Sequence, residues 1–129
     1  MTTRDRDEGT PTVSLRTIII DALEPWANWA YGRYGYPVYL VGSLLDTDDA
    51  RDIDIRIVLP TEQFYGRFPR GNEDPKFGEE LGKQNRWLVD TYKRNFDFQI
   101  QSEQQAAKYE DCPKVRLDSV WKEDSEPSP

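Results

Sequence analysis

The chain has 129 residues, a net charge of −7, no histidine and a single cysteine, Cys112. These totals exclude a Ser-His-Asp triad, a Cys-His pair, a His-ligated zinc site and an internal disulfide. The acidic balance argues against tight binding of duplex DNA. Because the sequence has neither a membrane-length apolar run nor a secretory leader, we expect one cytoplasmic domain that does not enter a membrane.

The first third of the chain predicts a helix followed by a strand. Residues 1–11 are polar and charged and are expected to be disordered. A helix is expected over residues 12–34, capped by Thr12 or Ser14 and kinked or split at Pro25. Its apolar stripe follows a 3–4 spacing: Leu15, Ile18, Ile19, Leu23, Trp26, Ala30 and Tyr34. A short apolar strand over 38–41, buried on both faces, comes next.

The remaining elements complete an α+β pattern. Strands are expected over 53–59 and 96–101, an edge strand over 115–117, and helices over 75–94 and 103–109. Residues 61–74 contain glycine, proline and asparagine and are expected to be irregular. We therefore predict a small mixed sheet with helices on one face, built by residues 12–117. Residues 118–129 are expected to form a polar, acidic tail.

The central stretch, residues 38–60, carries the candidate chemistry. Strand alternation places Asp52, Asp54 and Arg56 on one face and isoleucines on the other. Asp97 projects from the polar face of the 96–101 strand, so pairing of the two strands would bring three carboxylates together. Such a group can hold Mg²⁺ or Mn²⁺ through oxygen ligands. Gly42 precedes them at the end of a strand, where the backbone can approach a phosphate closely.

These motifs together resemble the nucleotidyltransferase superfamily of the DNA polymerase β type. The matching features are apolar–Gly–Ser at residues 41–43, Asp–apolar–Asp at 52–54 and apolar–Asp–apolar at 96–98. Members of that superfamily include antibiotic nucleotidyltransferases, CCA-adding and poly(A) enzymes and the nucleotidyltransferases of toxin–antitoxin modules. The runs DIDIR and DFQIQ also resemble small phage and prophage members. The resemblance implies a mixed sheet flanked by helices.

The resemblance also implies a role for each matching residue. Gly42 and Ser43 would bind the triphosphate of an NTP. Asp52 and Asp54 would bind the catalytic metal ions, and Asp97 would complete the metal site and activate the acceptor hydroxyl. The implied activity is metal-dependent transfer of a nucleoside monophosphate to a small molecule, an RNA or a protein.

Several features keep other interpretations open. Only eight residues separate Ser43 from Asp52, and little chain remains for a second, substrate-holding domain. Arg56 can bind a phosphate, or it can pair with an aspartate and occupy the metal position. A catalytically inactive nucleotidyltransferase-like fold that acts as a binding or inhibitor protein is therefore the alternative. Asp52 and Asp54 can also be the solvated face of an edge strand, and a toxin-like enzyme that modifies a host molecule is a further possibility.

Overall fold

The computed structural model describes residues 14–42, 44 and 52–120, and it has the predicted α+β architecture. Its strands form one mixed sheet in the order β3-β2-β1-β4. The strands are β1 (Val38–Val41), β2 (Asp52–Leu59), β3 (Asn95–Ser102) and β4 (Val115–Arg116). Strand β2 is parallel to β3 and antiparallel to β1, which is itself antiparallel to β4. The sheet is therefore mixed, and β4 is an edge strand as predicted.

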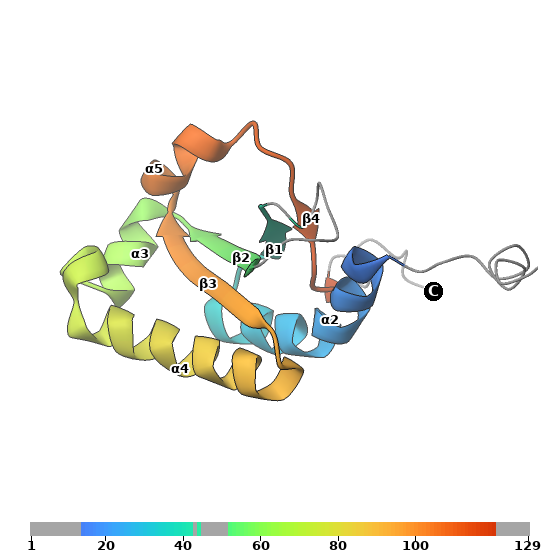
Figure 1. Cartoon of the computed structure of the whole chain (residues 1–129). Coiled ribbons are helices and arrows are strands. Elements are labelled where there is room, and N and C mark those ends of the chain that lie inside the picture. The colour runs from blue at the N-terminus through green and yellow to red at the C-terminus, as the bar shows by residue number, and fades with distance from the viewer. Residues whose placement is uncertain (1–13, 43, 45–51, 121–129) are drawn as a thin grey trace, which may run out of the picture.

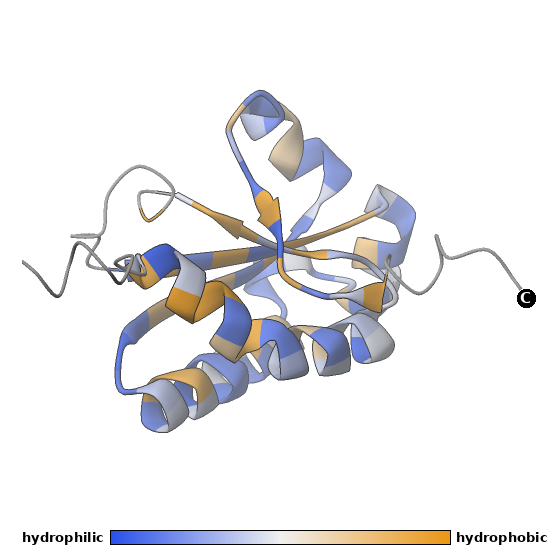
Figure 2. Cartoon of the chain, turned by 90° about the vertical axis from the view of Figure 1, so that its right-hand side faces the viewer, coloured by the Kyte–Doolittle hydropathy of each residue, from blue (hydrophilic) through white to orange (hydrophobic). Residues whose placement is uncertain are grey.

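Two long helices, α2 (Leu15–Tyr34) and α4 (Pro75–Tyr92), lie across one face of this sheet (Figures 1 and 2). Ser14 caps α2, because its hydroxyl accepts a hydrogen bond from the backbone N–H of Thr17 at 3.1 Å. Asp74 caps α4 in the same way, through the backbone N–H of Lys76 at 3.0 Å. Both helices thus begin where a short oxygen-bearing side chain precedes the apolar periodicity.

Two details of α2 differ from expectation. Of the two outcomes expected at Pro25, a kink or a split, the split is wrong, because the helix continues through Pro25 to Tyr34. Pro25 lies on the exposed side of the helix, whereas Trp26 and the next residue are buried, so packing on the inner side offsets the missing backbone hydrogen bond. Ile18, which the spacing placed on the buried stripe, is 51% exposed.

Residues 61–74 are more ordered than predicted. They form α3 (Thr61–Arg67) and the 3₁₀-helical turn η2 (Gly71–Glu73). Phe64 and Phe68 are spaced one helical turn apart, and both are buried against Phe77 with ring centroids 5.8 and 5.1 Å away. This aromatic cluster stabilises a helix that the glycine and proline content argued against. The expected short helix over 103–109 is confirmed, as α5 (Glu103–Ala106) and the 3₁₀-helical turn η3 (Ala107–Tyr109).

The core lies between the two long helices and one face of the sheet. Every second side chain of the central strands is buried there: Val38, Leu40, Ile53, Ile55, Ile57, Leu59, Phe96, Phe98 and Ile100. The intervening side chains of β1, β2 and β3 are half-buried or exposed, so β1 is buried on one face only and not on both as predicted. The polar side chains of β2 and β3 therefore share the second face.

The end of the described chain is hydrogen-bonded to the rest of the domain. Asp118, which the composition assigned to the polar tail, is 1% exposed, and it accepts a hydrogen bond from the backbone N–H of Val38 at 2.9 Å. The lead expected over residues 1–11 and the tail from residue 121 onward lie outside the described residues. No helix in the described part of the chain is long and apolar enough to cross a membrane.

Candidate functional site

Three carboxylates of the central strands lie on the second face of the sheet. Strand β2 is an interior strand between β3 and β1, so Asp52 and Asp54 do not lie on an edge strand. Asp54 is in register with Asp97 on the neighbouring parallel strand. Neighbouring strands are about 4.8 Å apart, so the two side chains stand next to each other. Asp52 shares their face, two residues before Asp54. The pairing that the sequence required is therefore present.

Asp97 is held in place by two side chains of the same face. The Gln99 amide donates a hydrogen bond to one of its carboxylate oxygens at 2.8 Å. An Arg56 guanidinium nitrogen lies 3.6 Å from the other carboxylate oxygen. Arg56 is itself fixed, because its second terminal nitrogen donates to the backbone carbonyl oxygens of Ile55 and Asp97 at 2.9 Å each. Arg56 is thus oriented across the two parallel strands and forms its ion pair with Asp97.

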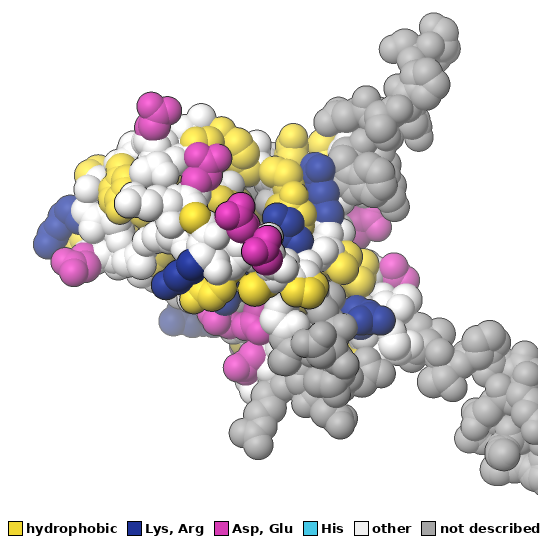
Figure 3. Space-filling model, turned by 90° about the horizontal axis from the view of Figure 1, so that it is seen from above, with side chains coloured by type: hydrophobic (Ala, Val, Ile, Leu, Met, Phe, Trp, Pro, Cys, Tyr) yellow, Lys and Arg dark blue, Asp and Glu magenta, His cyan; other side chains and the backbone are white. Residues whose placement is uncertain are grey.

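The charge at Asp54 is incompletely compensated. Burial raises the pKa of the Asp54 carboxyl, the Arg56 guanidinium lowers it, and the carboxylates of Asp97 and Asp52 raise it again. The net direction is upward, so desolvation and repulsion outweigh the attraction of Arg56. Near the centre of the second face, Asp or Glu side chains adjoin Lys or Arg side chains (Figure 3). A site of this kind gains stability when a further cation binds to it.

Gly42 brings bare backbone against this carboxylate. The residue follows β1 directly and has φ +85°, a left-handed conformation that favours glycine. A Cβ atom placed on Gly42 would lie 3.0 Å from the carboxylate carbon of Asp54 and would overlap one of its oxygens. The end of β1 and the Asp54 carboxylate are therefore in contact only because residue 42 has no side chain.

We expect Gly42→Ala to lower the free energy of unfolding by about 1–3 kcal/mol, because a left-handed residue with a side chain is strained and its methyl group must displace the Asp54 carboxylate. Urea denaturation followed by tryptophan fluorescence measures this. Gly32→Ala is the matched control, since no atom lies within 4 Å of its added methyl group in helix α2. That control should raise stability by about 0.5–1 kcal/mol. Equal effects of the two substitutions would contradict the close approach of Gly42 to Asp54.

One positioning residue was missed at the sequence level. Strand β3 lies at the edge of the sheet, where backbone groups lack a strand partner. The Asn85 side chain of α4 fills that role, because its oxygen accepts from the backbone N–H of Phe98 at 2.8 Å and its nitrogen donates to the Phe98 carbonyl oxygen at 3.2 Å. Asn85 therefore fixes the strand that carries Asp97. Asn85 lies one turn from Leu81 on the inner side of α4, where a polar residue is unusual. The sequence does not reveal that its partner is the backbone of Phe98.

The remaining site predictions have different outcomes. Ser43 lies outside the described residues. Gly42, Asp52, Asp54, Arg56 and Asp97 are brought to one place. Among residues 14–42, 44 and 52–120, however, no three His, Cys, Asp or Glu side chains are grouped so that they could hold a metal ion as they lie. The strand pairing thus brings the carboxylates together, but the Asp97 carboxylate is engaged by Arg56 and Gln99.

Comparisons with protein-family models, with curated proteins and with solved structures find no match for this chain.

Proposed function

We propose that the protein is a metal-dependent nucleotidyltransferase, which transfers a nucleoside monophosphate from an NTP to a hydroxyl group. The observation that carries the proposal is the register of Asp54 with Asp97, with Asp52 on the same face and Gly42 against the Asp54 carboxylate. Further support comes from the strand directions. Strand β2 is antiparallel to β1, which Gly42 follows, and parallel to β3. The sequence resemblance implies the same combination of motifs.

The proposed reaction assigns a task to each end of the site. The acceptor oxygen forms a bond to the α-phosphorus of the NTP, the bond from that phosphorus to the bridging oxygen of the pyrophosphate breaks, and pyrophosphate leaves. Asp97 accepts the proton of the acceptor hydroxyl. Gly42 brings the end of β1 against the Asp54 carboxylate, and Arg56 offers the positive charge that a phosphate oxygen needs.

The chemistry of the donor set suits Mg²⁺ or Mn²⁺. Both ions prefer oxygen ligands, and the raised pKa of Asp54, caused first by burial, reflects negative charge that the protein leaves partly uncompensated. Asp52, Asp54 and Asp97 would hold the ion, and when bound it would stabilise the charge that develops on the transferred phosphoryl group. The Asp97 carboxylate would exchange its contact with Arg56 for the ion. Arg56 would then be released toward the substrate phosphates.

A second candidate function is a nucleotide-binding or inhibitor protein without catalysis. It is favoured by the ion pair of Arg56 with Asp97, which places a protein cation where the metal ion would compete. The two candidates differ in what they expect from Arg56→Ala. In a metal-dependent enzyme the unaltered protein already binds Mn²⁺, and removing the competing cation raises the affinity further. A site in which Arg56 replaces the metal binds Mn²⁺ only after the substitution.

We expect Mn²⁺ together with an NTP to stabilise the protein. A ligand present at 100 times its Kd adds about 2.7 kcal/mol, which corresponds to a rise in Tm of roughly 10 °C for a domain of this size. Differential scanning fluorimetry with each of the four NTPs, with and without Mn²⁺, measures the effect. The control is Ca²⁺ with the same NTPs, which shows whether the smaller ions are preferred. If no NTP shifts Tm in the presence of Mn²⁺, the enzymatic proposal is wrong.

A further inference from the structure

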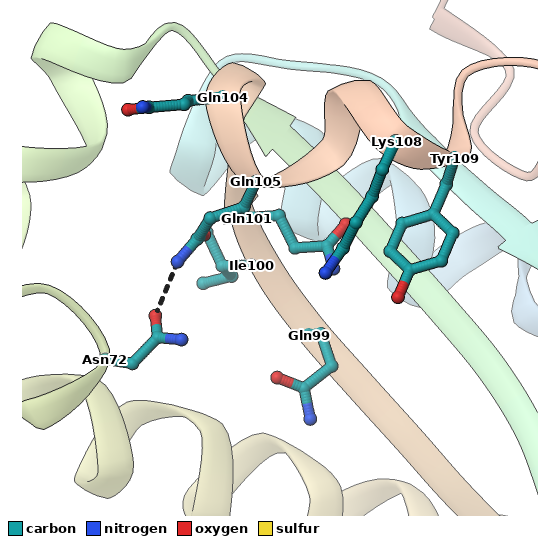
Figure 4. A pocket seen from close by; sticks show the side chains of 8 residues that line it. All are labelled: Asn72, Gln99, Ile100, Gln101, Gln104, Gln105, Lys108 and Tyr109. Carbon is teal, nitrogen blue, oxygen red and sulfur yellow. Dashed lines mark hydrogen bonds between the residues drawn. The ribbon is translucent and has the colours of Figure 1, made fainter.

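A polar pocket of about 310 Å³ lies on the same side of the sheet as the carboxylates (Figure 4). Strand β3 forms its floor through Gln99 and Gln101, and Asn72 of η2 and the turn η3 form its walls. Lys108 and Tyr109 extend from η3 toward the two glutamines of the strand. Gln99 also donates to the Asp97 carboxylate, so the pocket is continuous with the candidate site.

The side chains of the pocket divide into those used by the fold and those left for a ligand. Gln105 is used fully, because its oxygen accepts from the backbone N–H of Ser102 at 2.9 Å and its nitrogen donates to Asn72 at 3.2 Å. In contrast, the Gln101 side chain has no hydrogen bond to any part of the chain that the structure describes. The same holds for the Asn72 amide nitrogen and the Gln99 amide oxygen. These groups face the pocket with hydrogen-bond donors and acceptors that the described part of the chain does not use.

The chemistry of this lining selects one class of ligand. A carboxamide presents a donor and an acceptor side by side, which matches the paired donor and acceptor on the edge of a nucleobase. Tyr109 offers a ring that is 52% exposed, and aromatic rings stack on bases of any sequence. The Lys108 ammonium lies 5.3 Å from the centre of that ring and so steadies it. No carboxylate is among the residues that line the pocket, which disfavours a polycation.

We propose that this pocket binds an unpaired nucleobase, stacked on Tyr109 and hydrogen-bonded to Gln101 and Gln99. Gln101 lies four residues beyond Asp97 along β3, a distance of about 13 Å. A base in the pocket whose sugar extends toward Asp97 would bridge this distance. Resting on the proposed function, in which Asp97 activates the acceptor hydroxyl, we assign the base to the acceptor and not to the NTP.

Nucleosides without phosphate, titrated into the full chain in EDTA by calorimetry, test the pocket separately from the metal site. At least one of adenosine, guanosine, cytidine and uridine should bind, and glucose should not. Gln101→Ala and Tyr109→Ala should each weaken binding about tenfold or more, the loss expected for a stacked or edge-paired base. Gln63→Ala is the matched control, because this glutamine is exposed on helix α3 and is not among the residues that line the pocket, so it should leave the Kd unchanged.

Three outcomes would overturn the proposal. These are no binding of any nucleoside, binding of glucose as strong as that of the nucleosides, or equal binding by the three variants. A single-stranded RNA tetramer, compared with the nucleosides, distinguishes a strand end from a free nucleotide as the source of the base. A nucleoside and an NTP with Mn²⁺ should bind together; competition between them would overturn the acceptor assignment. Failure of the nucleoside titration leaves the Mn²⁺ and NTP shift in Tm unaffected, so the two proposals fail independently.

Discussion

Asp54→Asn is expected to lower nucleotidyl transfer by at least about 10²-fold, because several kcal/mol of metal-dependent stabilisation are lost and each 1.36 kcal/mol corresponds to a factor of ten. The same substitution should remove the rise in Tm that Mn²⁺ and NTP produce in the unaltered protein. Asparagine keeps the shape of the side chain and the backbone register with Asp97, so the loss reports the charge alone. Asp90→Asn, on the exposed side of α4, is the matched control and should leave both measurements unchanged.

In the absence of metal ions, Asp54→Asn should instead raise the stability of the protein near neutral pH. Burial has the largest influence on the pKa of Asp54 and raises it; Arg56 lowers it, Asp97 and Asp52 raise it, and the net direction is upward. The folded state therefore binds this proton more tightly than the unfolded chain, so stability falls as pH rises through the raised pKa. Below the ordinary aspartate pKa of about 3.9, the carboxyl is protonated in both states and its charge costs nothing.

Asp54→Asn should thus match the unaltered protein in acid and exceed its Tm at pH 7 in EDTA. Scanning calorimetry from pH 3.5 to pH 8 measures the difference. A variant that gains stability and loses activity indicates a carboxylate retained for its function. If the variant is less stable at pH 7, the protein itself already compensates the charge of the Asp54 carboxylate, which contradicts its raised pKa.

Strand alternation made the carboxylate site predictable. Over residues 52–57 and 95–101 the polar and apolar residues alternate strictly, so which of these residues share a face follows from sequence alone. The parallel register of Asp54 with Asp97 does not follow from that pattern. It is set by the chain between the strands, which folds into α3 and α4 and returns β3 beside β2 in the same direction.

Other features depended on contacts between distant residues. The packing of Phe64 against Phe77 stabilises a helix in a segment rich in glycine and proline. Hydrophobic periodicity does not reveal this contact. The Asn85 contact with the edge of β3 and the capping of Val38 by Asp118 join residues far apart in the chain. The pocket was missed for the same reason, since Asn72 and Tyr109 come together only when β3 and its flanking turns are assembled.

Strand β3 contributes both to the core and to the candidate site, and a substitution at Phe98 is expected to affect the core contribution first. This residue is fully buried between Asp97 and Gln99 but points to the opposite face, where its ring meets that of Trp26 edge-on at 5.2 Å. Phe98→Ala should lower the free energy of unfolding by about 3–5 kcal/mol. That is a fifth or more of a typical total of roughly 5–15 kcal/mol.

Urea denaturation should therefore give a much lower midpoint for Phe98→Ala, with an unchanged m-value if the native state stays compact. Trp87→Ala removes another large aromatic residue, but one that is 48% exposed, and it should cost about 1 kcal/mol or less. Hydrogen exchange should show faster opening of β3 in Phe98→Ala, because the inner face of that strand loses its main anchor while Asn85 still holds its edge. Equal destabilisation by the two substitutions would mean that β3 is not anchored through Phe98. The carboxylate and pocket residues would then need another explanation for their fixed positions.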